Sequence, residues 1–352
     1  MSEPRIVADR DTARPARTYT VAIAGATGVV GGTVRQILEE RGFPVGELRL
    51  LASERSQGAQ LAFAGKTVAV QALRDDSFAG VDLVFFAAGG SVSKEFVPKA
   101  VAAGAIVIDK SSAFRHDPAV PLVVPEVNPE ALAAHHGIVA TPNCSTIQMV
   151  VALKPLYDAV GIKRVVVATY QSVSGAGKRG VDALAHQSAQ AVAGDAVLDE
   201  HFPHRIAFNL LPHIDSFLPS GSTREEQKMV DETHKIFADP DLAVSATCVR
   251  VPVFGAHSEA LNIETRRRVT ATEARELLAA FPGIEVVDDP ASLSYPTPLD
   301  AEGRDAVFVG RIREDDTIAN GLNLWVVSDN LRKGAALNAV QIAEELVRRG
   351  QL

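Results

Sequence analysis

Residues 20–31 read Thr20-Val21-Ala22-Ile23-Ala24-Gly25-Ala26-Thr27-Gly28-Val29-Val30-Gly31. The first five residues predict a buried strand, and the glycines after them begin a helix that we expect to run to about Glu40. Glycine permits a tight turn and lets a phosphate group approach the N-terminus of the helix. The spacing is G-x-x-G-x-x-G rather than G-x-G-x-x-G, so a tight turn that holds no ligand is the alternative. The strand–turn–helix context favours nucleotide binding.

Strands and helices alternate downstream of this turn. We predict a helix around 93–103, and strands at four further places: 48–51, 68–70, 83–86 and 106–109. Segments of this length joined by crossovers predict a mostly parallel sheet. Residues 19–143 are therefore expected to form a Rossmann-like α/β domain of the nucleotide-binding type.

The second half has longer and more amphipathic strands. A helix over 145–160 precedes predicted strands at 164–170, 244–253, 261–265, 284–287, 307–313 and 322–327. This pattern predicts an α+β domain over 144–329, with a mixed or antiparallel sheet and helices on one face. An amphipathic helix near the C-terminus, within 330–350, is expected to pack back on the first domain.

Composition limits the possible functions. The 352 residues suffice for two domains, and the formal net charge of −8 gives no general attraction for nucleic acid. Two cysteines cannot build a disulfide framework, which favours a reducing cytoplasm. Residues 1–18 are polar and charged, so we expect a disordered tail, and we find no apolar run long enough to cross a membrane.

One of the two cysteines lies at the start of a predicted helix, a position that favours a reactive thiolate. Cys144 lies in the run Thr141-Pro142-Asn143-Cys144-Ser145-Thr146, at the start of the predicted second-domain helix. Unpaired backbone N–H groups and the positive end of the helix dipole favour the thiolate there, and they also suit an oxyanion. The alternative is that Cys144 is a small buried apolar residue, as most free cysteines are.

The residues after the second strand bear on the choice of dinucleotide. An NAD-binding domain usually has an acidic residue at this strand end, which binds the ribose 2′-hydroxyl. Glu54 is one position late, whereas Ser53, Arg55 and Ser56 cluster there and suit a 2′-phosphate. We therefore predict NADP(H), and Glu54 leaves NAD open.

Three later segments carry polar or charged side chains that could serve a site: 171–177 (QSVSGAG), 224–228 (REEQK) and 250–257 (RVPVFGAH). The first and the third also contain glycine. Glu225 and Lys228 are three apart and share a helix face, which by itself is more typical of a surface ion pair. Pro252 and Gly255 interrupt the third segment. Sequence alternation therefore does not predict whether Arg250 and His257 face the same way.

These motifs occur in one order, and together they resemble the aspartate-β-semialdehyde dehydrogenases. The resemblance includes the glycine turn, 142–146 (PNCST), the three segments above and 329–336 (DNLRKGAA), and it covers about residues 19–350. One departure is Gln227, where many members have an aromatic residue. We expect this difference to affect packing more than mechanism. Cys248 lies in an apolar strand and is predicted to be a core residue.

The resemblance implies a role for each residue. Cys144 would be the nucleophile and His257 the general acid/base, with Gln171 and Asn143 completing the catalytic set. Arg250 would bind the substrate carboxylate and Glu225 the substrate ammonium, with Gln171 orienting the substrate. Arg115 and Lys228 would bind phosphate. The residues implied for the cofactor are Gly25, Thr27, Gly28, Val29, Val30, Gly31, Ser53, Arg55, Ser56, Ser174, Gly175 and Asn330. No metal is expected.

The implied reaction is NADPH-dependent reduction of L-aspartyl-4-phosphate to L-aspartate 4-semialdehyde, through a covalent thioester. This step belongs to lysine, threonine, methionine, isoleucine and diaminopimelate biosynthesis. The resemblance also implies a homodimer or a tetramer. Two alternatives stay open. An N-acetyl-γ-glutamyl-phosphate reductase would not need Glu225 to bind a free ammonium. A non-catalytic NADP-sensing protein would not require Cys144, His257 and Arg250 together.

Overall fold

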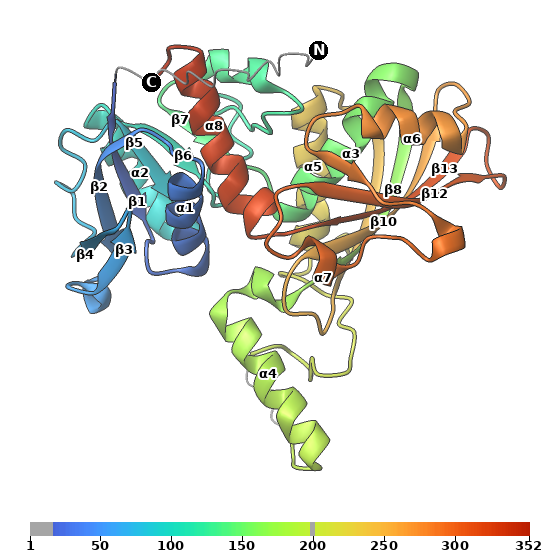
Figure 1. The fold of residues 1–352 in the computed structure, drawn as a ribbon, viewed down its shortest axis with the longest axis horizontal. Coiled ribbons are helices and arrows are strands. Elements are labelled where there is room, and N and C mark those ends of the chain that lie inside the picture. The colour runs from blue at the N-terminus through green and yellow to red at the C-terminus, as the bar shows by residue number, and fades with distance from the viewer. Residues whose placement is uncertain (1–16, 198–200) are drawn as a thin grey trace, which may run out of the picture.

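A computed structural model describes residues 17–197 and 201–352 of the protein. It contains two sheets side by side, each with its own helices (Figure 1). The disordered tail predicted for residues 1–18 lies outside the described residues except for Arg17 and Thr18. The Arg17 guanidinium is 3.1 Å from Asp82 and stacks over the ring of Tyr19. Among the described residues, no helix is both long and apolar enough to span a bilayer.

The first sheet follows the predicted Rossmann-like pattern. Its strand order is β3-β4-β2-β1-β5-β6-β7, and every neighbouring pair in the described chain is parallel except β3–β4. β1 ends where the glycine turn begins, so the turn lies at the carboxyl edge of the sheet, where such folds bind ligands. The strands are β1 (Tyr19–Ala24), β2 (Val45–Ala52), β3 (Gln60–Phe63), β4 (Lys66–Ala72), β5 (Leu83–Phe86), β6 (Ile106–Asp109) and β7 (Ile138–Ala140).

Helices cover both faces of this sheet. α1 (Val29–Glu40) and the C-terminal helix α8 (Leu337–Arg348) share one hydrophobic cluster with the sheet, and α2 (Gly90–Ala102) belongs to another. The first turn of the C-terminal helical segment, Arg332–Ala336, is a π-helix. The end of the chain therefore packs against the first sheet, although its preceding strand belongs to the second (Figure 1).

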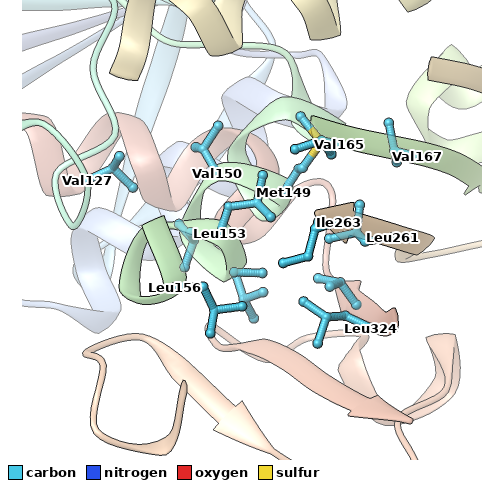
Figure 2. Packing of buried hydrophobic residues seen from close by; sticks show 14 of the residues in the cluster. Val127, Met149, Val150, Leu153, Leu156, Val165, Val167, Leu261, Ile263 and Leu324 are labelled. Atoms are coloured by element: carbon cyan, nitrogen blue, oxygen red, sulfur yellow. The ribbon is translucent and has the colours of Figure 1, made fainter. Parts of the chain in front are cut away.

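The second sheet is mixed, with the order β11-β12-β13-β10-β8-β9. Helices α3, α5 and α6 lie on one face, and the largest hydrophobic cluster fills the space beneath α3 (Figure 2). The strands are β8 (Ile162–Gln171), β9 (Ala243–Arg250), β10 (His257–Thr265), β11 (Ile284–Val286), β12 (Val307–Asp315) and β13 (Gly321–Ser328). The helices of this half are α3 (Cys144–Val160), α4 (Lys178–Ala193), α5 (Arg224–Phe237), α6 (Ala271–Ala279) and α7 (Pro298–Ala301).

The predicted fold class is confirmed, and the differences are local. The strand predicted over 244–253 ends at Arg250, because Pro252 lacks the N–H group that a strand would donate. The sequence analysis did not predict α4, which projects away from both sheets (Figure 1). Only three of its residues are buried, Gly180, Leu184 and Gln187. Its apolar stripe is therefore too narrow to give a strong periodic signal.

Candidate active site

Three adjacent strands place three of the predicted site residues in one row. Gln171 at the end of β8 lies opposite His257 at the start of β10, and it also lies opposite Arg250 at the end of β9. All three side chains are buried, on the sheet face that packs against α3 and α5. Because both residues lie opposite Gln171, the side chains of Arg250 and His257 point to the same face of the sheet. Sequence alternation alone did not predict this.

Cys144 is the first residue of α3, as the sequence analysis predicted. Asn143 caps the helix, because its Oδ1 accepts a hydrogen bond of 2.9 Å from the backbone N–H of Ser145. Gly334 packs directly against the cysteine, and a Cβ atom at that glycine would lie only 3.0 Å from the Cβ of Cys144. Cys144 as a whole residue is partly exposed, whereas Cys248 is buried.

A cavity of about 360 Å³ connects Cys144 to the glycine turn. Its walls come from six places in the sequence: the turn itself, Ala87 after β5, Lys110 after β6, the start of α3, the Ser174–Lys178 loop and the C-terminal segment from Asn330. The predicted residues that line it are Thr27, Gly28, Val29, Val30, Cys144, Ser174, Gly175 and Asn330. The cavity therefore brings the nucleophile candidate and most of the cofactor candidates together.

Gly25 and Gly31 do not line the cavity but shape the turn beneath it. Gly25 has a φ of +88°, and a Cβ there would lie 2.7 Å from the carbonyl oxygen of Ala87. A Cβ at Gly31 would lie 2.3 Å from the carbonyl oxygen of Gly25. Both positions therefore require glycine, and the turn leaves the N-terminus of α1 open at the cavity wall.

Ser53, Arg55 and Ser56 lie beside the glycine turn rather than in the cavity. Ser53 precedes a single 3-10 turn over Glu54–Ser56, and the hydroxyl of Ser56 lies 3.5 Å from that of Thr27. Arg55 is exposed. Arg74, which the sequence analysis did not select, lies 3.9 Å from Glu54. The loop therefore presents Arg55, while Arg74, which follows β4, lies close enough to offset the charge of Glu54.

The ring of His257 is fixed by the backbone. Its Nδ1 accepts a hydrogen bond of 3.1 Å from the N–H of Ser172, which only a donor can make, and it lies 3.0 Å from the Ser172 hydroxyl. The proton of the neutral ring is therefore on Nε2, which has no partner among the described residues. Burial, together with the charge of Arg250, lowers the pKa of His257 to about 3. The ring is therefore neutral at pH 7.

Glu225, at the start of α5, is the centre of a buried hydrogen-bond network. Its Oε1 accepts from Asn143 at 2.8 Å and from Gln171 at 3.3 Å, and its Oε2 accepts from Lys228 at 3.1 Å. Burial raises the pKa of Glu225, but Lys228, Asn143 and Arg250 together hold it below its ordinary value. The carboxylate is therefore charged and ties the cap of α3 to Gln171.

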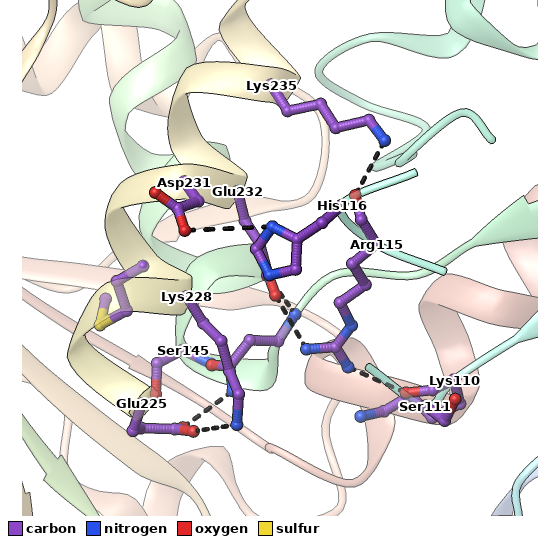
Figure 3. A network of polar contacts seen from close by, with 12 residues as sticks. Lys110, Ser111, Arg115, His116, Ser145, Glu225, Lys228, Asp231, Glu232 and Lys235 are labelled. Atoms are coloured by element: carbon purple, nitrogen blue, oxygen red, sulfur yellow. Dashed lines mark hydrogen bonds and ion pairs between the residues drawn. The ribbon is translucent and has the colours of Figure 1, made fainter. Parts of the chain in front are cut away.

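Arg115 is paired with a carboxylate that the sequence analysis did not select. Its Nη1 lies 2.9 Å from Glu232, and its Nη2 donates to the carbonyl of Lys110 at 2.9 Å (Figure 3). Glu232 in turn accepts from the backbone N–H of Asn143 at 2.6 Å. The guanidinium thus lies one hydrogen-bonded step from the residue before Cys144, and its buried Nε has no partner in the described chain.

Lys228 lies in a second cavity, of about 760 Å³, which also has Asp215 and Asp231 in its wall. Its ammonium is held by Glu225 at 3.1 Å (Figure 3). Asp215 also holds it, at 2.8 Å. The two predicted phosphate residues therefore belong to one polar network, and both are paired with carboxylates in this structure.

The charges around Cys144 oppose one another. Burial and the carboxylate of Glu225 raise the pKa of the thiol, whereas Lys110, Arg250 and Arg115 lower it, and the net pKa lies above its ordinary value. The expectation of a thiolate set by the helix start alone is therefore corrected, because that expectation did not include the desolvated, partly acidic surroundings.

Lys110 and Glu232 are the site residues that sequence reasoning missed. Lys110 follows β6 at the carboxyl edge of the parallel sheet, and this position was the available signal. Glu232 gave no signal beyond its place on the predicted helix. Among the described residues, no group of three or more histidine, cysteine or acidic side chains is arranged to hold a metal ion.

Comparison with known proteins agrees with this geometry. Residues 20–135 match the model "Semialdehyde dehydrogenase, NAD binding domain", and residues 153–333 match "Semialdehyde dehydrogenase, dimerisation domain". The aspartate-semialdehyde dehydrogenase of Aquifex aeolicus is 57% identical over 336 residues, which cover 94% of this chain and 99% of that protein.

Solved structures give the same result. Aspartate semialdehyde dehydrogenase II of Vibrio cholerae, crystallised in complex with ASA, has a TM-score of 0.93 and 53% identity, covering 95% of this chain and 99% of that one. The Candida albicans enzyme, solved with NADP, has a TM-score of 0.75 and 26% identity, covering 96% and 100%. These names agree with the main prediction and with neither alternative. The chain therefore belongs to the aspartate-semialdehyde dehydrogenase family.

Proposed function

We propose that this protein reduces L-aspartyl-4-phosphate to L-aspartate 4-semialdehyde with release of phosphate, and catalyses the reverse, phosphorylating reaction. The observation that carries the proposal is the cavity that joins Cys144 to the glycine turn, at the end of the row formed by Gln171, Arg250 and His257. The A. aeolicus relative bears the name of this activity, and the V. cholerae structure was determined with ASA.

Cys144 is the proposed nucleophile. Its sulfur attacks the acyl carbon of the substrate, phosphate leaves, and the acyl group stays on the cysteine as a thioester. The proton on Nε2 of His257 is placed for donation to an oxygen that becomes negative during attack, because Nδ1 is held as an acceptor by Ser172. Asn143 and Gln171 fix the approach, since both are hydrogen-bonded to Glu225.

The substrate's α-carboxylate and ammonium are assigned to Arg250 and Glu225. Arg250 is buried, and its Nη1 is held by the carbonyl of Ser172 at 2.7 Å, which orients the guanidinium for a two-point contact with a carboxylate. Glu225 is charged and lies in the same network. An ammonium bound there would share the carboxylate with Lys228.

Phosphate is assigned to Arg115 and Lys228. The carboxylates of Glu232, Glu225 and Asp215 neutralise these two cations in the structure described here. A phosphate bound there could share each cation with its carboxylate, because Nε of Arg115 has no partner among the described residues and Lys228 has a third N–H donor. The negative charge of these carboxylates would oppose the incoming anion, so phosphate affinity depends on the network as a whole.

The cavity and the glycine turn are the proposed site of a nicotinamide dinucleotide. Gly25, Gly28 and Gly31 let the chain turn tightly at the N-terminus of α1, where a pyrophosphate would bind, and the Arg55 loop lies beside this turn, where a 2′-phosphate would bind. When bound, the reduced cofactor would supply the hydride for thioester reduction. Thr27, Gly28, Val29 and Val30 would hold its phosphate end, and Ser174, Gly175 and Asn330 line the part of the cavity near Cys144.

The proposed function includes an oligomeric state and a cellular location. The second domain carries the dimerisation match, and its outer sheet face has an apolar cavity of about 540 Å³ between Ala168, Ala260 and Trp325. We assign this face to the partner of a homodimer, and light scattering will distinguish the dimer from a tetramer. A cytoplasmic location, in lysine, threonine, methionine, isoleucine and diaminopimelate biosynthesis, belongs to this proposal.

The test is formation of NADPH from L-aspartate 4-semialdehyde, NADP and phosphate. Phosphate-dependent turnover that is absent in a Cys144→Ala control supports the reaction, the substrate and the nucleophile together. Folded protein that binds NADP but gives no turnover would contradict the proposal. N-acetyl-γ-glutamyl phosphate and its aldehyde would then be assayed next.

A further inference from the structure

Glu232 has no role in the proposed reaction, although its carboxylate is buried between two residues of the proposed site. Its side chain is 1% exposed, and its two oxygens have different partners. Oε1 lies 2.9 Å from Nη1 of Arg115 (Figure 3). Oε2 accepts a hydrogen bond of 2.6 Å from the backbone N–H of Asn143. The carboxylate therefore joins a proposed phosphate residue to the residue directly before Cys144.

The contact with Asn143 completes the start of α3. A helix often has a glutamate at its third residue, which binds the backbone N–H of the capping residue. In α3 the third residue is Thr146, whose buried hydroxyl has no partner among the described residues. Glu232 of α5 supplies the acceptor from another helix. The start of α3, and with it Cys144, is therefore tied to α5.

The guanidinium of Arg115 has few other contacts that fix it. Its Nη2 donates to the carbonyl of Lys110 at 2.9 Å, and its Nε has no partner in the described part of the chain. The backbone of its loop is held separately, because the ammonium of Lys235 donates to the carbonyl of Arg115 and to two carbonyls that follow it. Loss of the Glu232 contact would therefore free the guanidinium while the loop stays anchored to α5.

Asn143 depends less on Glu232 than Arg115 does. Its Oδ1 accepts from the backbone N–H of Ser145 at 2.9 Å, and its Nδ2 donates to Glu225 at 2.8 Å. Neither of these contacts involves Glu232, so both would remain without it. A change at Glu232 should therefore displace the guanidinium of Arg115 more than it displaces the start of α3.

We propose that Glu232 is a positioning residue for the phosphate step, and that it holds the guanidinium of Arg115 at a fixed place relative to Cys144. The inference rests on the proposed function, in which Arg115 binds phosphate and Cys144 carries the acyl group. A phosphate oxygen must reach the acyl carbon at close range and in the right direction, so the position of the bound cation matters as well as its charge. Glu232 acts through Arg115 and not on the substrate.

The test separates the two half-reactions of the full-length protein. Without phosphate, L-aspartate 4-semialdehyde and NADP should give a single turnover of NADPH and leave the acyl group on Cys144. Added phosphate should then remove the acyl group as the acyl phosphate. Rapid quenching, followed by mass spectrometry of the Cys144 peptide, measures the rate of this loss at each phosphate concentration.

Glu232→Gln keeps the size of the side chain but offers a single acceptor oxygen to two donors, so the link between Arg115 and Asn143 is broken. Acyl loss at saturating phosphate should fall by about tenfold or more, whereas the single turnover without phosphate should stay nearly unchanged. Glu232→Asp keeps the charge on a shorter side chain and should show the same split, and it provides the measurement if the glutamine variant does not fold. The matched control is Glu276→Gln, on the exposed surface of α6, which should leave both rates unchanged.

Three results would overturn the inference. Equal losses in both half-reactions would mean that Glu232 supports the site as a whole. A changed dependence on phosphate concentration, with an unchanged rate at saturation, would mean that Glu232 acts only through its charge. Unchanged rates in the folded variants would mean that Arg115 keeps its place without Glu232. Wild-type protein that loses no acyl group to phosphate would contradict the proposed function and, with it, the inference.

Discussion

Gln171 and His257 lie directly opposite each other across the antiparallel β8–β10 pair. The parallel β8–β9 pair places Arg250 opposite the same glutamine. Because side chains alternate between the two faces of a sheet, a slip of one residue in either pairing would move a member of the row to the wrong face. The apolar residues beneath α3 that fix this register therefore also position the site, although they lie away from it (Figure 2).

Cys144→Ala should abolish turnover and leave NADPH binding nearly intact, because the cavity wall keeps its shape when only the sulfur is removed. Steady-state assays and cofactor fluorescence measure the two properties. Cys248→Ala is the matched control. Cys248 is buried beside Met229, and burial raises the pKa of its thiol, so we expect activity to be kept at some cost in stability. Weak NADPH binding by folded Cys144→Ala would contradict the assignment.

Arg250→Lys should raise the KM for L-aspartate 4-semialdehyde by about tenfold or more, because an ammonium cannot make the two-point contact of a guanidinium. The hydrogen bond to Ser172, at 2.7 Å, would also be lost or bent. Arg348→Lys, at the exposed end of α8, provides a control for the same substitution elsewhere. An unchanged KM would place the carboxylate site at another residue.

Arg55→Ala should weaken NADPH binding more than NADH binding, because only the former has a 2′-phosphate for the guanidinium to bind. Arg55 is exposed, so its removal leaves no cavity and should not alter stability. The ratio of the two dissociation constants is the measurement. Equal losses for both cofactors would show that Arg55 does not contact the 2′-phosphate, and Arg74 would then be the next residue to change.

The sequence predicted most of the elements, and many of the residues it singled out line one cavity or one row of strand ends. The glycine turn was predictable because its conformation depends on residues adjacent in the chain, as the φ of +88° at Gly25 illustrates. The sequence did not predict that Arg250 and His257 share a face of the sheet, because this depends on how β9 and β10 each pair with β8. The pKa of His257 depends on burial and on Arg250, and neither can be read from neighbouring residues.

The ion-pair partners of charged side chains could not be predicted from the sequence either. Glu232 is separated from Arg115 by more than a hundred residues, so their ion pair exists only once α5 has packed beside the β6 loop. Lys110 was passed over for a related reason. Its placement in the cavity wall follows from the parallel order of β1, β5 and β6, and not from any motif around it.

Gly175→Ala should lower turnover by about tenfold or more without unfolding the protein. A Cβ there would lie 3.0 Å from Nη1 of Arg250 and 3.2 Å from Nε2 of His257, so both side chains must shift, and small misplacements in an active site are costly. Gly32→Ala is the matched control, because a Cβ at Gly32 in α1 meets nothing within 4 Å. Normal turnover in Gly175→Ala would mean that Arg250 and His257 need not hold these positions.

Glu259→Gln should stabilise the protein increasingly as pH rises from about 5 to 7. Glu259 is fully buried on the site face of β10, and neither carboxylate oxygen is within hydrogen-bond geometry of a donor among the described residues. The amide of Gln148 lies close enough to lower the pKa of Glu259, but it does not offset the effect of burial. Burial raises its pKa well above the ordinary 4.5. The folded state therefore keeps a proton that the unfolded state releases. Stability contributed by this group is present below the unfolded pKa and is lost as pH rises.

The loss amounts to at most about 1.4 kcal/mol per pH unit between the unfolded and folded pKa values, and glutamine, which does not titrate, avoids it. Urea unfolding of both proteins at several pH values measures the difference. Glu130→Gln, on the exposed surface, is the control and should run parallel to the wild type. A Glu259→Gln difference that stays constant from pH 5 to 7 would mean that Glu259 ionises within the fold, with a counter-charge or water that stabilises it.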